Sequence, residues 1–145
     1  MAGIRRQARI AALQVLYELD CTKHKVEEAL ARLRAGDALT QGALGFTEEL
    51  VIGVLQNKPE LDTLIKEFAP AFPAEQMSIV DRSILRLAIF EILFNDKTPF
   101  KVAINEAVEL AKAFGSDSSP RLINGVLGSI AIRHGIKQVE PHQGV

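Results

Sequence analysis

The sequence predicts an all-α protein of about seven helices, packed as two helical sub-bundles within one domain. Apolar residues recur at helical spacing along most of the 145 residues, and no segment shows the alternation typical of strands. A hydrophobic fraction of 48% and a charged fraction of 24% are typical of a globular chain. The two prolines of PAFPAEQ, residues 70–76, predict a stiff connector between sub-bundles at about 1–69 and 77–136, and the tail at 137–145 is expected to be flexible.

The first sub-bundle is expected to be built around the helix at residues 4–20. Its apolar stripe runs from Ile4 to Leu19, and further apolar residues on its other sides indicate that neighbouring helices cover most of it. Three shorter helices follow it. They are predicted at about 26–33, at 46–55 after a glycine-containing loop, with Thr47 as a possible N-cap, and at 59–68, with Pro59 as a favourable first residue.

The second sub-bundle is predicted to be centred on the helix at residues 78–94, whose apolar residues surround its axis. Charged residues interrupt this helix, and a charge inside a bundle needs a partner. We expect Arg86 and Glu91 to pair internally, whereas Asp81, near the helix start, is the better candidate for an exposed contact with a protein partner. Two further helices are predicted, one at 102–114 with Gly115 just past its end, and one that starts at Pro120 with Ser119 as its cap and ends at Gly135.

The chain carries little that indicates catalysis or a bound metal. It has no glycine-rich phosphate loop and no nucleophile elbow, and its histidines, His24, His134 and His142, lack partners at metal-ligand spacing. Cys21 is the sole cysteine, so an internal disulfide is excluded. Neither a signal peptide nor a run of about 18 apolar residues is present. We therefore expect a cytoplasmic binding protein without catalytic residues, cofactor, metal or membrane segment.

Three arginines, Arg5, Arg6 and Arg9, form the first candidate site. They lie within about 100° of each other on the helical wheel, and no acid precedes Glu18 to balance them. At a helix N-terminus the macrodipole makes each cation unfavourable by roughly 0.3–1 kcal/mol, so the cluster contributes little to folding. Guanidinium groups and free N–H groups both suit phosphate, which indicates a nucleic acid as the ligand. The alternative is a solvated cationic end that only keeps the chain soluble.

The start of the last predicted helix is a second candidate anion site. Ser119, Pro120 and Arg121 place a hydroxyl, free N–H groups and a cation at one helix N-terminus, although the same residues also make an ordinary cap. Tyr17 is the only tyrosine, and its ring suits either stacking on an unpaired base or an amphipathic place in the core. Together these features predict a two-sided cradle for single-stranded RNA.

Three stretches of the chain resemble the NusB family of bacterial transcription antitermination factors. They are RRQARIAALQVLY near the start, DRSILRLAIFEI in the middle and PFKVAINEAVELAKAFGSDSSPRLINGVL near the end, whereas residues 22–60 match only in hydrophobic pattern. The resemblance implies an all-helical fold and RNA binding without catalysis. The RNA-binding residues that it implies are Arg5, Arg6, Gln7, Arg9, Gln14, Tyr17, Phe114, Ser118, Ser119 and Arg121. By the same resemblance, Asp81 falls in the region that faces the partner protein NusE.

The resemblance also implies a set of partners. Members of the family bind the boxA element of ribosomal RNA transcripts together with NusE, a ribosomal small-subunit protein, and act on RNA polymerase with other Nus factors to suppress premature termination. Some members self-associate, so a homodimer that hides the arginine motif is one alternative. The other is a stand-alone NusB-like RNA-binding domain of the kind found in ribosomal RNA cytosine methyltransferases, although 145 residues leave no room for their catalytic domain.

Two residues depart from the pattern of the family. Gln7 stands where many relatives carry another arginine, and its neutral side chain is expected to lower the salt slope of RNA binding by up to about one unit. Ser118 stands where some relatives carry an acid, and the missing negative charge is expected to strengthen the binding of phosphate. The two departures act on RNA affinity in opposite directions.

Overall fold

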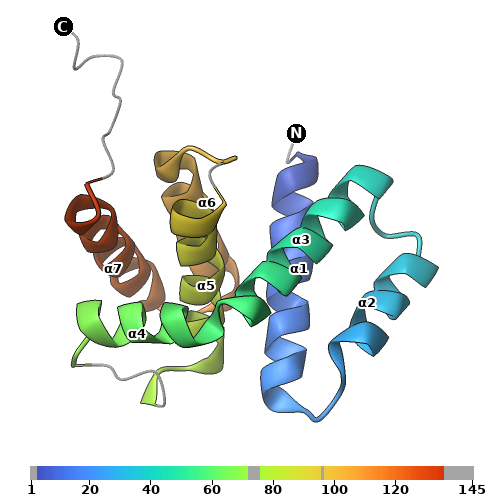
Figure 1. Cartoon of the computed structure of the whole chain (residues 1–145), viewed down its shortest axis with the longest axis horizontal. Helices are drawn as coiled ribbons and strands as arrows, with labels where there is room; N and C mark the ends of the chain where they lie inside the picture. Colours follow the sequence, from blue (N-terminus) through green and yellow to red (C-terminus); the bar gives the residue numbers. More distant parts are fainter. Residues whose placement is uncertain (1–2, 72–75, 96, 136–145) are drawn as a thin grey trace, which may run out of the picture.

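The computed structural model describes residues 3–71, 76–95 and 97–135, and this part of the chain is all-α, as predicted (Figure 1). It contains seven α-helices, one π-helical turn and no strand. The elements are α1 (Ile4–Cys21), α2 (Val26–Ala35), α3 (Gln41–Gln56), α4 (Lys58–Phe68), α5 (Ile79–Ile89), the π turn η2 (Phe90–Phe94), α6 (Phe100–Phe114) and α7 (Ser119–Arg133). The predicted tail at 137–145 and most of the predicted connector at 70–76 lie outside the described residues, and the division into two sub-bundles stays a prediction.

One cluster of buried apolar side chains runs through the described helices. α5 lies at its centre and contacts α1, α4, α6 and α7. Ile84, Leu85 and Ile89 of α5 are fully buried, which is what its apolar residues on all sides predict. α1 packs against α3, and both helices bury small residues, Ala8 on α1 and Ala43 on α3, which allow their backbones to approach closely.

α3 begins earlier than the sequence predicts. Thr40 is its N-cap, and the Thr40 Oγ1 accepts a hydrogen bond from the Ala43 N–H at 3.2 Å. Thr47, the predicted N-cap, is instead buried inside the helix, where its hydroxyl donates to the Ala43 carbonyl at 2.7 Å and lies 3.3 Å from the Ala8 carbonyl of α1. Two glycines of the predicted loop are therefore helical, because burial against α1 outweighs their low helix propensity. α4 likewise starts one residue before Pro59.

The predicted helix at 78–94 consists of two elements, because α5 gives way to the π turn η2 at Phe90. Phe90, Glu91 and Ile92 are three consecutive buried residues. The Phe90 ring packs directly on the backbone of Gly53 in α3, where a Cβ atom would lie 2.1 Å from the ring Cζ. Glycine is required at this position by the close approach of the ring, and η2 directs the Glu91 carboxylate toward α1.

Arg86 and Glu91 each form ion pairs inside the protein, as predicted, but with other residues and not with each other. Arg86 donates two hydrogen bonds to Asp62 of α4, at 2.7 and 3.0 Å, and one to Asp20 of α1 at 3.0 Å. Its guanidinium therefore joins three helices, α1, α4 and α5. Because the charge is bound on more than one side, it costs the core far less than an isolated buried charge.

Asp81 is buried, so the prediction that its carboxylate is exposed is wrong. It lies in the first turn of α5, and its backbone N–H donates to Oγ of the N-cap residue Ser78 at 3.1 Å. The carboxylate oxygen Oδ1 has no hydrogen-bond partner among the described residues. A negative charge in the first turn is favoured by the helix dipole, which stabilises the carboxylate without exposure to water.

The turn between α6 and α7 differs from the predicted cap. Ser118, rather than Ser119, occupies the N-cap position, and Ser119 is the first helical residue. Ser119 is buried, and its Oγ accepts a hydrogen bond from the Ser116 N–H at 2.9 Å. A Cβ atom at Gly115, which directly follows α6 as predicted, would lie 2.5 Å from this Oγ. The glycine is thus required by a close contact across the turn.

Candidate nucleic-acid interface

Arg9 is the innermost of the three N-terminal arginines. Its Nε donates to Glu91 Oε2 at 2.7 Å and its Nη2 donates to Glu91 Oε1 at 2.9 Å. Arg9 is 4% exposed and Glu91 is 2% exposed, so the pair joins α1 to η2 in the interior. Two parallel charge-assisted hydrogen bonds stabilise such a pair as a unit. The guanidinium that the sequence assigns to RNA is therefore already bound within the fold.

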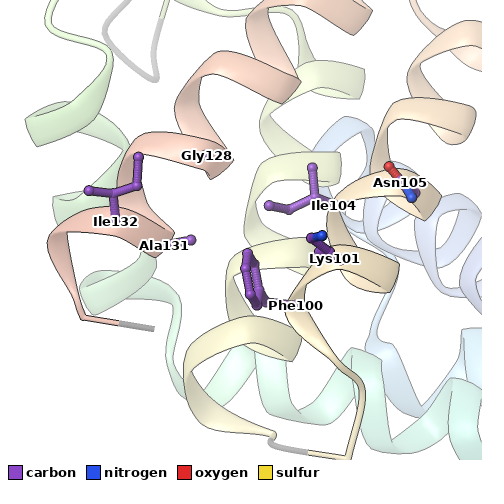
Figure 2. Close-up of a pocket in the computed structure, with 7 residues that line it drawn as sticks. All are labelled: Phe100, Lys101, Ile104, Asn105, Gly128, Ala131 and Ile132. Carbon is purple, nitrogen blue, oxygen red and sulfur yellow. The ribbon is translucent and has the colours of Figure 1, made fainter. Parts of the chain in front are cut away.

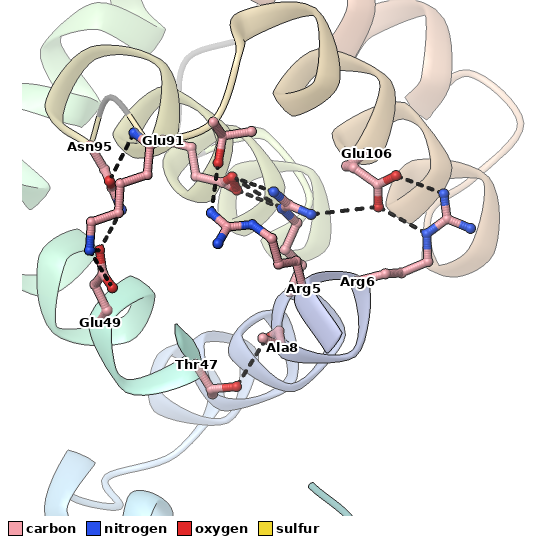
Figure 3. A network of polar contacts seen from close by, with 11 residues as sticks. Arg5, Arg6, Ala8, Thr47, Glu49, Glu91, Asn95 and Glu106 are labelled. Atoms are coloured by element: carbon pink, nitrogen blue, oxygen red, sulfur yellow. Dashed lines mark hydrogen bonds and ion pairs between the residues drawn. The ribbon is translucent and has the colours of Figure 1, made fainter. Parts of the chain in front are cut away.

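Arg6 lies on the exposed side of α1 and is bound by Glu106 of α6 (Figure 3). Its Nε donates to Glu106 Oε1 at 2.9 Å and its Nη2 donates to Oε2 at 2.7 Å. The Arg6 side chain is 43% exposed and the Glu106 side chain 17% exposed. Hydrogen bonding to Arg6, reinforced by its charge, holds the pKa of Glu106 below its ordinary value. Arg9 Nη1 lies 3.8 Å from the same carboxylate, which therefore faces two cations.

Arg5 extends toward other neighbours of α1. Its Nη2 donates to Thr98 Oγ1 at 3.0 Å, in the segment that precedes α6. Its guanidinium also lies over the ring of Phe46 in α3, with Cζ 4.0 Å from the ring centroid. A cation–π contact at a site open to solvent is worth about 0.5–1 kcal/mol. Arg5 thus helps to hold α1 against α3 and the start of α6.

The arginine cluster is balanced by acids that come from later in the chain. The sequence predicts unpaired cations, because no acid precedes Glu18, and this prediction is wrong for two of the three arginines. Glu91 of η2 and Glu106 of α6 reach the cluster and leave it with one unit of net positive charge. The sequence indicates that Glu91 needs a partner, because it interrupts an apolar helix, but it does not single out Glu106, which lies on an ordinary amphipathic helix.

The exposed side of α1 carries two groups of polar side chains, one at its start and one further along, with the partly buried Ile10 between them. Arg6, Gln7, Gln14 and Tyr17 are all exposed, and at 100° per residue they fall within about 100° of arc. We call these four residues the α1 face. Together they offer a guanidinium, two amides and a phenol, which are the groups that bind phosphates and the edges and faces of unpaired bases. The helix thus brings four of the predicted RNA-binding residues to one surface.

Tyr17 is available for stacking on this face. Its side chain is 44% exposed, so it does not take the core position that was the alternative. Hydrogen bonding to the Cys21 side chain, one turn further along α1, raises the pKa of the Tyr17 phenol. The phenol is therefore neutral near pH 7, and no negative charge opposes an approaching nucleic acid. Stacking of a base on an aromatic ring is worth about 1–3 kcal/mol.

The turn between α6 and α7 presents a second group of predicted residues. Phe114, Ser118 and Arg121 are exposed there. Ser119 is buried, and its Oγ is engaged by the backbone of the turn, so it shapes this group without facing solvent. The turn ends α6, the helix whose carboxylate binds Arg6. The Arg6 contact thus links the helix that carries this turn to the α1 face.

A cavity of about 400 Å³ lies between α6 and α7 (Figure 2). Its lining is mostly apolar and consists of Phe100, Lys101, Ile104, Asn105, Gly128, Ala131 and Ile132. No acid or histidine is among the described residues that line it. In residues 3–71, 76–95 and 97–135, no three His, Cys, Asp or Glu side chains come together in a way that could hold a metal ion. The cavity therefore offers no catalytic constellation.

The fold and the surface together define a class of protein. It is a small all-α protein whose first helix presents a polar, partly basic face suited to nucleic acid. Within the described part of the chain, no helix combines the length and the apolar character needed to cross a membrane. The chain belongs to the NusB family, whose model, described as "NusB family", matches residues 6–132.

Relatives with this family name match almost the whole chain. The transcription antitermination protein NusB of Dehalococcoides mccartyi (strain CBDB1) is 50% identical over 131 residues, which cover 90% of this chain and 92% of that protein. The protein of the same name from Chloroflexus aggregans is 45% identical over 136 residues, which cover 92% of this chain and 91% of the relative.

Solved structures agree with the fold. The structure of T. maritima NusB matches with a TM-score of 0.81 and 31% identity, covering 88% of this chain and 90% of that one. A crystal structure of the antitermination factors NusB and NusE in complex with double-stranded RNA matches with a TM-score of 0.82, covering 92% of this chain and 99% of that one. Its sequence is 23% identical, so this second likeness shows the fold alone.

Proposed function

We propose that this protein is a transcription antitermination factor that binds boxA-type single-stranded RNA of ribosomal RNA transcripts together with NusE. With other Nus factors it helps RNA polymerase to read through terminators. It is not an enzyme, and it acts in the cytoplasm. The proposal is supported by relatives at 45% and 50% identity that carry the name transcription antitermination protein NusB. A NusB protein of the same fold has been crystallised in complex with NusE and double-stranded RNA, which agrees with the two classes of partner proposed.

The observation that carries the proposal is the α1 face. Arg6 supplies a cation for phosphate, and Tyr17 supplies an exposed ring for an unpaired base. Gln7 and Gln14 each supply an amide with donors and an acceptor for base edges. Rings and amides need unstacked bases, which single-stranded RNA offers and a closed duplex does not. Phe114, at the end of α6, offers a second exposed ring.

The experiment is a fluorescence anisotropy titration of a boxA-type RNA at several salt concentrations. Arg5→Ala combined with Arg6→Ala is expected to weaken binding and to flatten its salt dependence, because phosphate contacts are lost. The matched control is Arg32→Ala combined with Arg34→Ala, two exposed arginines of α2, which changes the net charge equally. Equal affinities of the Arg5/Arg6 variant and the wild type would reject the proposal.

The α1 face is tested separately from net charge by Tyr17→Ala. The loss of one stacked base is expected to cost about 1–3 kcal/mol, which corresponds to a roughly 5- to 150-fold weaker affinity. The salt slope is expected to stay unchanged, because no charge is removed. A variant that binds as well as the wild type would remove Tyr17 from the interface.

The partner proteins call for two further measurements. Co-purification on boxA-type RNA, with and without NusE, tests whether NusE increases retention of this protein. Self-association is a proposed competing state in which a second copy covers the arginine motif. Light scattering is then expected to detect dimers that dissociate as RNA is added, and dimers that persist at saturating RNA would contradict this competition.

A further inference from the structure

Glu106 is an acid placed at a surface that otherwise offers cations and amides. Its two oxygens accept hydrogen bonds from Nε and Nη2 of Arg6, at 2.9 and 2.7 Å. This is the two-bond geometry in which an arginine also binds a phosphate. Figure 3 shows the carboxylate lying directly against the Arg6 guanidinium. A protein carboxylate therefore occupies the position that a phosphate group would take on Arg6.

The fold depends little on this carboxylate, which also lies 3.8 Å from Nη1 of Arg9 but is not its main partner. The buried pair of Arg9 and Glu91 already joins α1 to η2, and α6 is held in the core by its own apolar side. The Arg6 side chain is partly open to solvent, and ion pairs of that kind contribute only about 0–1 kcal/mol. The effect of Glu106 on charge is larger, because it neutralises Arg6, the single cation among the four residues of the α1 face.

We infer that Glu106 is a built-in competitor for RNA phosphate, and that the Arg6–Glu106 pair marks a phosphate subsite which RNA enters by displacing the carboxylate. The inference rests on the proposed function. While Glu106 holds Arg6, this cation adds less to the salt slope than a free arginine would, because part of its charge is already neutralised. Glu106 thereby limits the affinity of the α1 face for polyanions.

The test is Glu106→Gln in the full chain, with a boxA-type RNA as the probe. The amide keeps the size of the side chain and a hydrogen-bond acceptor for Arg6, but it removes the competing charge. One additional phosphate contact on single-stranded RNA raises the salt slope by about 0.7 unit. If this contact contributes nothing at about 1 M salt, a slope of about 0.7 makes the affinity of the variant roughly eightfold higher than that of the wild type at about 0.05 M salt. The same slope makes it roughly threefold higher at about 0.2 M.

Two controls separate competition from a general charge effect. Glu48→Gln also removes one acid from an exposed arginine pair, with Arg34, and changes the net charge equally. It is expected to leave the affinity nearly unchanged. In an Arg6→Ala background, Glu106→Gln is expected to lose its gain, because the subsite no longer exists. If Glu106→Gln does not fold, Glu106→Asp, which withdraws the carboxylate by one methylene, is expected to give a smaller gain of the same sign.

The outcomes distinguish this inference from the proposed function. A wild-type protein that binds no RNA overturns the proposed function and the inference with it. A wild-type protein that binds RNA while Glu106→Gln binds equally well or more weakly overturns the inference alone, since Glu106 then does not compete. A gain that persists in the Arg6→Ala background also overturns it.

Discussion

A substitution of Arg9 is expected to lower the stability of the protein if the residue is structural, and to lower RNA affinity alone if the residue binds RNA. Arg9→Met keeps most of the apolar stem of the side chain but removes its guanidinium group and its charge. Glu91, only 2% exposed, then stays in the interior without a counter-charge. Breaking a buried ion pair by removing one partner costs about 3–5 kcal/mol. Domains of ordinary stability have about 5–15 kcal/mol in total, so the loss is a large fraction of the free energy of unfolding.

Urea denaturation followed by circular dichroism measures this loss as a fall in the midpoint at unchanged slope. Arg6→Met is the matched control, because it breaks an exposed pair on the same helix and is expected to cost only about 0–1 kcal/mol. Arg9→Met combined with Glu91→Leu is expected to regain most of the stability, since an apolar pair of similar volume replaces the buried ion pair without an unpaired charge.

The structural role of Arg9 is refuted if Arg9→Met is as stable as the wild type and loses RNA affinity to the same extent as Arg6→Met. That result would mean that the Arg9 guanidinium leaves Glu91 and reaches RNA in solution.

Substitutions at two glycines of α3, at Glu106 and at Ser118 are expected to have measurable effects. Gly53→Ala is expected to destabilise the protein by about 1–3 kcal/mol, because the new Cβ would lie 2.1 Å from Cζ of the Phe90 ring. Gly45→Ala is expected to stabilise α3 by about 0.4–1 kcal/mol, because a Cβ there has nothing within 4 Å, and thermal unfolding compares the two variants. Since the pKa of Glu106 is lowered by Arg6, its contribution to stability is full above the ordinary value of 4.5 and is lost as the pH falls through that value toward the lower pKa of the folded state. The stability difference between the wild type and Glu106→Gln is therefore expected to shrink from pH 6 to about pH 3, and a constant difference in urea titrations would contradict the pairing. Ser118→Asp is expected to weaken RNA binding at low salt by adding a negative charge beside the exposed turn, and equal anisotropy titrations would exclude the turn from the interface.

Hydrophobic periodicity predicts the helices of this protein where burial follows from their own sequence. The ends of α1 and α6 fall within two residues of the predicted bounds, because each has an apolar side and a recognisable stop. The prediction fails where a contact from another helix overrides local propensity. α3 extends back to Gln41 across two glycines because its first turns pack on α1. The π turn at Phe90 follows no periodic signal in the sequence, because the Phe90 ring packs on Gly53 of a different helix.

In the candidate site, too, the sequence predicts what depends on one helix and does not predict contacts between helices. Gln7 and Gln14 are expected at the RNA only from the resemblance to the family, whereas helical spacing is enough to show that they share one side of the helix with Tyr17. The environment of the arginines could not be predicted, because Glu91 and Glu106 lie 82 and 100 positions from their partners in sequence. A helical wheel contains no information about such long-range pairs, so it shows charges without showing which of them are already neutralised.

The contacts on the inner sides of α1 have a geometric consequence for its outer side. The Ala8 carbonyl lies 3.3 Å from the Thr47 hydroxyl of α3, while Arg9 is held on η2 by Glu91. These two contacts, on different helices, prevent α1 from rotating about its own axis. The direction in which the α1 face points is therefore determined by contacts that are made inside the protein. A larger side chain at Ala8 would turn Tyr17 relative to the rest of the molecule, and so change what the face can bind without altering a single exposed residue.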